Sequence, residues 1–375
     1  MNFGLTEEQE VLRRVARRFL DEQAPMEKVR EMMVSPEGFA EPLWAEMAEL
    51  GWLGLAIPEE FGGSGLGWVD LVVLLEETGR SLLPAPLIST SLASAAVLEY
   101  GSDEQKRRFL PRLADGSIVG TLALLEDSDI LGAPGIALVG TAENGGYRLR
   151  GTKRFVHDAG AARLFIVPFR TGDGDDDIAI GLIEAGASGG TAQSYPTMDQ
   201  TKRLGDLVLE DVAISSESVL VSSKDGAAAL ARLLDLAAVA VTAETVGAAA
   251  AALGITTQYA KDRIQFDAPI GKYQAVKHPL AEMHVDVESA RSLLYYAAWC
   301  VQESPAELPL AAARAKAYTS EAFSRIGVDG IQLHGAVGFT AEYDIQLYLK
   351  RSKWAAVAFG DVAHHYQRVA TLGGY

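Results

Sequence analysis

The chain has 375 residues and a formal net charge of −17, which argues against nucleic acid or an anionic membrane surface as a partner. Its composition, 49% hydrophobic and 22% charged, is that of an ordinary soluble protein long enough for two or three packed units. The single cysteine, Cys300, excludes internal disulfides and cysteine-based metal sites. The first ten residues lack an apolar signal core, and no apolar run is long enough to span a bilayer, residues 246–255 being the nearest candidate. We therefore expect a cytoplasmic protein that binds neither nucleic acid nor membrane.

The pattern along the chain is helix, then strand, then helix. Residues 1–118 are helical, with Thr6 capping the first helix and Val11, Val15 and Phe19 forming its apolar stripe. Residues 119–222 hold short β-rich runs split by glycine turns, and their acidic run at 173–177 is typical of a solvated hairpin tip rather than a metal site. Residues 223–375 return to helical patterns. These textures predict an α+β protein with domains at 1–118, 119–222 and 223–375.

A hinge at residues 263–278 joins the two longest helical patterns, 233–261 and 275–301. Proline and glycine at positions 269 and 271 end one helix and release the next. The hinge places Arg263, Phe266 and Gln274 at one helical corner. A guanidinium fork suits phosphate oxygens, the ring offers an aromatic face, and the amide can both donate and accept hydrogen bonds.

This hinge resembles the R-x-x-F-G-x-x-[IL]-x-x-[FY]-Q signature of acyl-CoA dehydrogenases, flavoproteins that desaturate acyl-CoA thioesters between Cα and Cβ; Asp267 stands at the glycine. Residues 50–63 and 332–339 are similar to two further patterns of that family, with Ala336 in place of one glycine. The resemblance covers essentially the whole chain. It implies an N-terminal helical domain, a central β-barrel-like domain and a C-terminal four-helix bundle. It also implies FAD as cofactor, an acyl-CoA substrate, an electron-transfer flavoprotein or other acceptor, and a homo- or hetero-tetramer.

The family resemblance assigns two sets of flavin contacts. In the family, the hinge signature and the glycine-rich segment reach the FAD of a neighbouring subunit, and the matching residues here are Arg263, Phe266, Gln274, Gln332 and Gly335. Glycine lets backbone approach phosphate oxygens because no Cβ stands in the way.

The segments that hold a subunit's own flavin are less well matched. The family's T-E-P-x-x-G-S-D loop corresponds to residues 122–129, which lack the proline and in which we assign Leu125 to the threonine. The family's W-[IV]-[TS]-N segment corresponds to residues 155–158, where His157 replaces the hydroxyl residue. A histidine there could donate a hydrogen bond to the flavin and change charge near neutral pH. A polar residue on a β turn is an equal alternative.

The catalytic base is the weakest match. Removing an α-proton from a thioester requires a carboxylate, but Phe359 and Ala237 occupy the two positions that the family uses. Glu244 lies two helical turns beyond Ala237 among apolar neighbours, and we expect it to be the base rather than a satisfied buried carboxylate. Asp361 is the second candidate, although a helix cap is the favoured interpretation. The resemblance implies that the Phe359 N–H contacts the thioester oxygen.

The implied reaction is an elimination in which a base takes the α-proton and the β-hydrogen leaves as hydride to flavin N5. Two alternatives stay open. One is a non-catalytic or half-catalytic subunit of a heteromeric acyl-CoA dehydrogenase, such as those acting on sterol side chains, because the contacts to a partner's FAD are kept better than the chain's own. The other is a flavin monooxygenase or oxidase on the same fold.

Overall fold

The computed structural model describes residues 4–174 and 176–375. Residues 1–3 of the N-terminal segment and Asp175 in the acidic run lie outside the described residues. The chain divides into two compact units, one made of residues 1–31, 68–83 and 238–375, the other of residues 32–67 and 84–237. Helices α2 (Met26–Val34) and α7 (Gly226–Asp262) each begin in one unit and end in the other.

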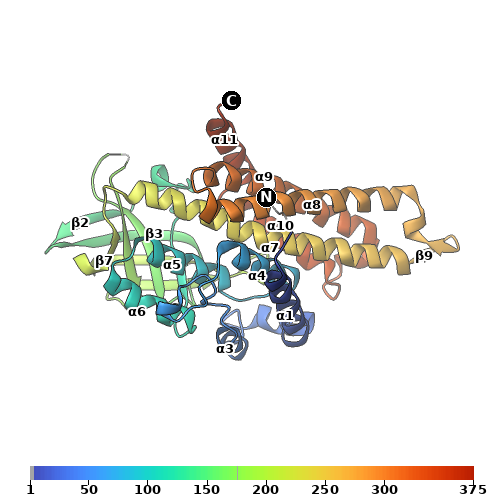
Figure 1. Ribbon diagram of the computed structural model, residues 1–375, viewed down its shortest axis with the longest axis horizontal. Coiled ribbons are helices and arrows are strands. Elements are labelled where there is room, and N and C mark those ends of the chain that lie inside the picture. Colours follow the sequence, from blue (N-terminus) through green and yellow to red (C-terminus); the bar gives the residue numbers. More distant parts are fainter. Residues whose placement is uncertain (1–3, 175) are drawn as a thin grey trace. The chain divides into compact units, whose positions relative to one another are not determined.

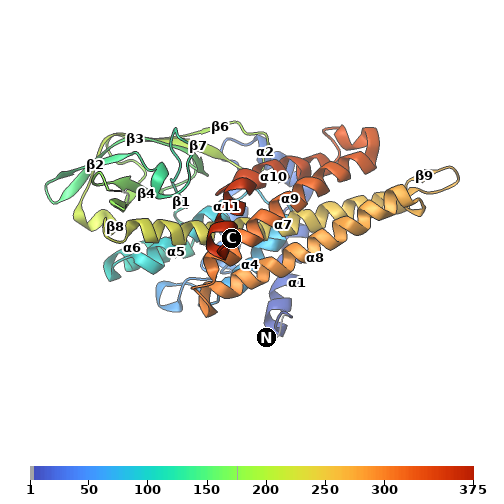
Figure 2. The ribbon, with the colours of Figure 1, turned by 90° about the horizontal axis from the view of Figure 1, so that it is seen from above.

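The first unit is helical, and α9 is its central element. This helix packs against α8, α10 and α11, while α4 packs against α1 and α8. Figure 1 and Figure 2 both show α8 and α9 running alongside each other. The helices are α1 (Glu7–Gln23), α4 (Trp68–Arg80), α8 (Gln274–Glu303), α9 (Leu308–His334), α10 (Ile345–Val357) and α11 (Val362–Gly373).

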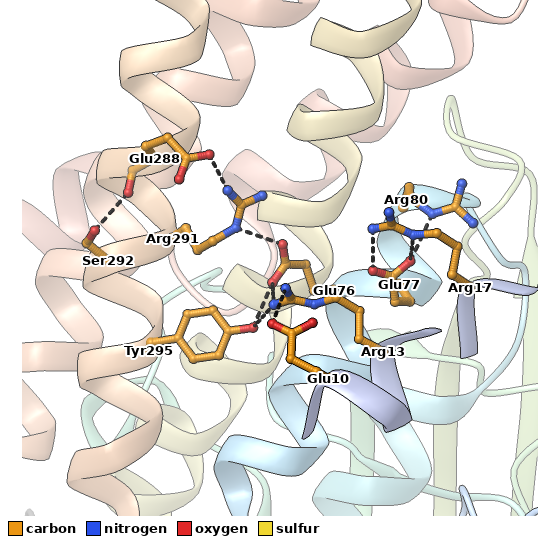
Figure 3. Close-up of polar contacts among 10 residues, drawn as sticks. All are labelled: Glu10, Arg13, Arg17, Glu76, Glu77, Arg80, Glu288, Arg291, Ser292 and Tyr295. Atoms are coloured by element: carbon orange, nitrogen blue, oxygen red, sulfur yellow. Dashed lines mark hydrogen bonds and ion pairs between the residues drawn. The ribbon is translucent and has the colours of Figure 1, made fainter. Parts of the chain in front are cut away.

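Two adjacent buried glutamates of α4 join the helices of this unit (Figure 3). Glu76 accepts hydrogen bonds from Arg291 Nε at 2.9 Å and Tyr295 Oη at 3.0 Å, both on α8. Glu77 accepts from Arg17 of α1, with 2.7 Å between Nη2 and Oε1. Buried carboxylates are tolerated when they are paired in this way. The network therefore fixes α1 and α8 against α4.

The same contacts correct the predicted face of α1. The Thr6 cap is confirmed, since its side chain accepts from Gln9 N at 3.2 Å. Val11 and Val15, however, are exposed. The packed face carries Ala16 and Leu20, together with arginines 13 and 17, which reach the glutamates of α4. A stripe of this kind cannot be found by hydrophobicity, because half of its members are charged.

The second unit is built on a mixed sheet whose strand order is β6-β7-β3-β2-β4-β5-β8, with β1 paired to β4. Within the described residues the sheet is open, with β6 and β8 at its edges, so the strands form no closed barrel. Among the described residues, the α-helices that lie entirely in this unit are α3 (Glu41–Glu49), α5 (Leu87–Tyr100) and α6 (Asp103–Ala114). The strands are β1 (Gly120–Leu122), β2 (Val139–Glu143), β3 (Gly146–His157), β4 (Leu164–Arg170), β5 (Ile178–Glu184), β6 (Gly190–Tyr195), β7 (Leu204–Ile214) and β8 (Val219–Val221).

Helix α7 is longer and more apolar than the sequence suggested. By length and composition alone, the whole helix could cross a membrane. The apolar run at 246–255, considered by itself, was too short to do so. Of its most apolar 18-residue window, however, 83% is buried inside the protein. Packing into the core therefore accounts for the apolar sequence.

Candidate functional site

A tight hairpin follows α7 and carries the first predicted flavin contacts. Its strands β9 (Ile264–Gln265) and β10 (Ala268–Pro269) are antiparallel and leave Phe266 and Asp267 as a two-residue loop. Both loop residues have positive φ, 53° and 57°, as a type I′ turn requires. Aspartate tolerates this conformation, so Asp267 can replace the glycine of the family signature. A phenylalanine at positive φ is uncommon and strained, which points to a functional demand.

The hairpin presents its side chains to solvent. Arg263, Gln274 and Phe266 are all exposed, and Phe266 as a residue is 89% accessible. The Phe266 ring makes one edge-on contact with Tyr273. In both Figure 1 and Figure 2 the hairpin stands beyond the ends of α7 and α8. An arginine, an aromatic ring and an amide are thus held together on a rigid turn, free to contact another molecule.

The glycine-rich segment begins where α9 ends, close to the end of α7. Tyr259 of α7 stacks on His334 at 4.4 Å between ring centroids and donates a hydrogen bond to its carbonyl oxygen. The flanking Gln332 and Gly335 are exposed. Gly335 has φ 63°, and a Cβ placed there would meet no atom within 4 Å. The structure therefore brings this segment to the same end of α7 as the hairpin and leaves open space over its backbone.

The second unit brings together the two segments predicted to hold the chain's own flavin. The carbonyl oxygen of Leu125 accepts from Arg154 N at 2.8 Å, and Thr121 Oγ1 donates to the carbonyl oxygen of His157 at 2.7 Å. The register of β3 shifts between positions 153 and 156. This bulge holds Phe155 at φ 51° with 47% of its side chain exposed. The bulge re-aims an aromatic ring outward, a common use of such irregularities, and the sequence alone did not reveal it.

One expectation for these segments needs correction, the change of charge at His157 near neutral pH. His157 does not titrate near neutral pH. Burial, with a smaller effect from the Lys202 charge, lowers the pKa of His157 to about 3, so its ring is neutral there.

A buried ion pair fixes the loop after β1 to β3. Lys153 Nζ lies 2.6 Å from Glu126 Oε1, and the other oxygen of Glu126 accepts from Ala137 N at 3.0 Å. Burial lowers the pKa of Lys153 to about 8, against the opposing effect of Glu126. The pair therefore holds the Leu125 segment by two contacts. The sequence gave no sign of it, because the partners are 27 positions apart.

The segment at the family's base position is a kink between α10 and α11. Phe359 is buried at φ 54°, and its carbonyl oxygen accepts from His365 Nε2 at 3.0 Å. Asp361 is the N-cap of α11, since its Oδ1 accepts from His364 N at 2.8 Å. The favoured interpretation of Asp361 as a helix cap is thereby confirmed.

Glu244 is a buried and paired carboxylate. Its Oε2 lies 3.3 Å from Nη1 of Arg351 on α10, and both side chains are buried. The Arg351 guanidinium also lies 5.5 Å from the centroid of the Trp354 ring. This contact supports the alternative that the sequence left open, a satisfied buried carboxylate, more than the role of base.

Sequence reasoning missed two buried polar residues next to the kink. Lys316 on α9 and His365 on α11 are each about 1% exposed, and both contact backbone carbonyls of residues 355–360. A lone lysine in the alanine-rich stretch 311–317 was the available signal. Among the residues that the structure describes, no group of three or more His, Cys, Asp or Glu side chains is arranged to hold a metal ion.

Fold and site together define a protein with the acyl-CoA dehydrogenase fold, and comparison with known proteins agrees. The family model "Acyl-CoA dehydrogenase, N-terminal domain" matches residues 6–117, and "Acyl-CoA dehydrogenase, C-terminal domain" matches residues 224–371. The relative named acyl-CoA dehydrogenase IpdE2, from Mycolicibacterium smegmatis, is 32% identical over 97% of this chain and 98% of its own length. The solved structure of butyryl-CoA dehydrogenase from Megasphaera elsdenii superposes with a TM-score of 0.92 at 27% identity, covering 100% of both chains. The ChsE4-ChsE5 complex from Mycobacterium tuberculosis gives 0.91 at 28% identity, covering 100% of this chain and 99% of the other.

The chain belongs to the acyl-CoA dehydrogenase family. It is an oxidoreductase of the class that acts on CH–CH groups, and members of the family are flavoproteins. The predicted fold class is confirmed, with an open mixed sheet in its β part.

Proposed function

We propose that the chain carries out FAD-dependent α,β-dehydrogenation of an acyl-CoA thioester within an oligomer, and that its hairpin contacts the FAD of a neighbouring subunit. The observation that carries this proposal is the Phe266–Asp267 tip, a strained turn that keeps an aromatic residue 89% exposed. Strained and exposed aromatic residues are costly unless a binding partner covers them. Arg263 beside it supplies a fork for phosphate oxygens.

The residues present fit this cofactor in two places. At the hairpin, Arg263 would contact phosphate oxygens and Phe266 would stack on a planar ring, while the open backbone at Gly335 admits a phosphate group. In the second unit, Phe155 and the neutral His157 would lie against the chain's own flavin. When bound, FAD would supply the acceptor for the β-hydrogen, which is taken as hydride at flavin N5.

The chain's own residues would bind and orient the thioester. The Phe359 N–H, directed by the kink, would donate to the thioester carbonyl oxygen and stabilise the negative charge that grows there as the α-proton leaves. A carboxylate over Cα must take that proton, and a double bond then forms between Cα and Cβ.

The test of the hairpin is flavin retention. Arg263→Ala should release FAD from the purified oligomer while the helical circular dichroism stays unchanged, because the lost contact is to phosphate. Arg14→Ala is the matched control, since Arg14 is an exposed arginine on α1 away from the hairpin. Equal flavin-to-protein absorbance ratios in the two variants would refute the proposal.

A second candidate function rests on the contacts of Glu244 and Asp361. Both carboxylates that the sequence offered as base are occupied, one by Arg351 and one by the first turn of α11. The chain would then be one subunit of a two-chain dehydrogenase, whose other chain supplies the base. One of the similar structures is itself a complex of two named proteins.

Expressing the chain alone separates the two candidates. A homo-oligomer that binds one FAD per chain and reduces it with acyl-CoA supports the self-sufficient enzyme. A chain that reduces flavin only after mixing with a second acyl-CoA dehydrogenase-like chain supports the heteromer.

A further inference from the structure

Lys316 is a buried ammonium whose hydrogen bonds all go to neutral oxygens. Its Nζ donates to Ser320 Oγ at 3.0 Å, to the carbonyl oxygen of Ala355 at 2.8 Å and to that of Gly360 at 3.1 Å. Its side chain is about 1% exposed. An ammonium has three hydrogens, so these acceptors use all of them. Burying a charge without a carboxylate in direct contact is costly, which calls for a reason.

The lysine contacts a strained segment of the backbone. Residues 358–361, hereafter the kinked segment, connect α10 to α11 and contain two consecutive positive φ angles, 54° at Phe359 and 104° at Gly360. A Cβ at position 360 would approach His365 Nε2 to 2.7 Å, so only glycine fits there. A non-glycine residue held in such a conformation persists only when its surroundings over-determine it.

Three contacts help to hold the kinked segment in this conformation. Lys316 holds the carbonyl of Gly360, and His365 holds the carbonyl of the preceding Phe359. The Asp361 side chain caps α11 on the far side. Lys316 also binds Ala355 O in the last turn of α10, where carbonyls lack helical partners and a positive charge is favourable. One side chain thus connects the end of α10 to the middle of the kinked segment.

We propose that Lys316 is a positioning residue that holds the kinked segment so that the Phe359 N–H points at the thioester carbonyl. The proposal rests on the proposed function for the role of that N–H. The lysine touches neither substrate nor cofactor in this role. It acts by holding the peptide planes that follow Ala355 and Gly360, on either side of Phe359.

The charge of the lysine matters to this role because hydrogen bonds from a charged ammonium to carbonyl oxygens are stronger than those from a neutral amine. Burial lowers the pKa of Lys316 to about 7, with the Asp361 charge opposing that shift. The other titratable groups beside it are His364 and His365 on α11, and the ring of His365 is neutral near pH 7 because burial lowers its pKa to about 3. As the pH rises through about 7 the amine becomes neutral, and its hydrogen bonds to the two carbonyl oxygens lose the added strength that the charge gives them.

The experiment uses the flavin-loaded oligomer, with its partner chain if one is needed for activity. Lys316→Met keeps the length of the side chain and removes all three donors, and Lys28→Met removes an exposed ammonium from α2 as the control. We expect Lys316→Met to slow flavin reduction at saturating acyl-CoA at least ten-fold, with flavin content unchanged, because small misplacement of a donor has large kinetic effects. The wild-type rate, relative to that of Lys316→Met, should fall as the pH rises through about 7.

Amide hydrogen exchange of residues 355–365 gives a readout that does not depend on catalysis. In Lys316→Met, exchange should rise in the kinked segment, whereas α9, which carries the substituted residue, should exchange as in the wild type. In the wild-type protein, exchange rates corrected for their intrinsic pH dependence should show the same local rise above about pH 7. This measurement tests the proposal even if the Lys316→Met variant fails to fold. Exchange raised uniformly through α9, or unchanged in the kinked segment, would overturn the proposal. If no acyl-CoA reduces the wild-type flavin, the proposed function is wrong. The exchange data still test whether Lys316 holds the kinked segment.

Discussion

Replacing Glu244 by glutamine separates a structural carboxylate from a catalytic one. The substitution preserves shape and hydrogen-bonding capacity but removes the negative charge that lies 3.3 Å from Arg351 Nη1, at a place where both side chains are buried. Removing one partner of a buried pair leaves the other charge uncompensated, at a cost of about 3–5 kcal/mol. Because the glutamine amide oxygen can still accept a hydrogen bond from Arg351, we expect Glu244→Gln to cost about 3 kcal/mol, the lower end of that range. For a chain of this size that lowers Tm by roughly 4 °C.

The assay is thermal unfolding followed by circular dichroism, run beside flavin reduction by acyl-CoA. Arg351→Met should destabilise by a similar amount, while the apolar double variant Glu244→Leu with Arg351→Met should recover much of the loss. Flavin reduction by folded Glu244→Gln should stay within a few-fold of wild type. A variant with wild-type Tm whose flavin reduction falls by two or more orders of magnitude would refute this reasoning and restore Glu244 as the base.

Three further predictions concern other contacts. Gly79→Ala should destabilise by about 1–3 kcal/mol in urea unfolding, because its Cβ would stand 2.0 Å from the carbonyl oxygen of Glu244; Gly254→Ala, with nothing within 4 Å, should stabilise by about 0.5–1 kcal/mol. Asp267→Gly should retain flavin as well as wild type, whereas Asp267→Val should lose it, because a β-branched residue resists φ 57°. The pKa of His157 is lower in the folded state, about 3, than its ordinary unfolded value near 6.5. Its contribution to stability is therefore present above pH 6.5 and lost as pH falls toward 3, and His157→Asn should reduce the slope of acid unfolding in that window by up to about 1.4 kcal/mol per pH unit.

The features that could be predicted from sequence are those made by neighbours in the chain. The break between α7 and α8 at residues 263–278 depends on residues within a few positions of each other, and so do the helix caps at Thr6 and Asp361. A sequence displays such breaks and caps directly, whereas the β9–β10 hairpin within the break was not predicted. The family resemblance then supplied the order of the domains.

The features that escaped prediction are made by partners far apart in sequence. Glu244 and Arg351 are 107 positions apart, and Lys316 lies 39 and 44 positions from the carbonyls that it holds. Apolar neighbours along α7 correctly indicated that Glu244 is buried, but they could not show which residue of another helix faces it. Burial was thus readable from the sequence, whereas pairing was not, and pairing is what bears on the choice between base and structural residue.

The hairpin β9–β10 is closed by its own contacts. Ile270 N donates to Arg263 O, Tyr273 Oη donates to Gln265 O, and the ring of Tyr273 meets Phe266. Its shape is therefore specified within about a dozen consecutive residues. Such a self-contained unit can be inherited unchanged while the strands and loops of the rest of the chain drift. A chain that can no longer bind its own cofactor could still contact the cofactor of a related chain through this hairpin. After gene duplication, one copy can therefore keep the cofactor site while the other contributes the hairpin.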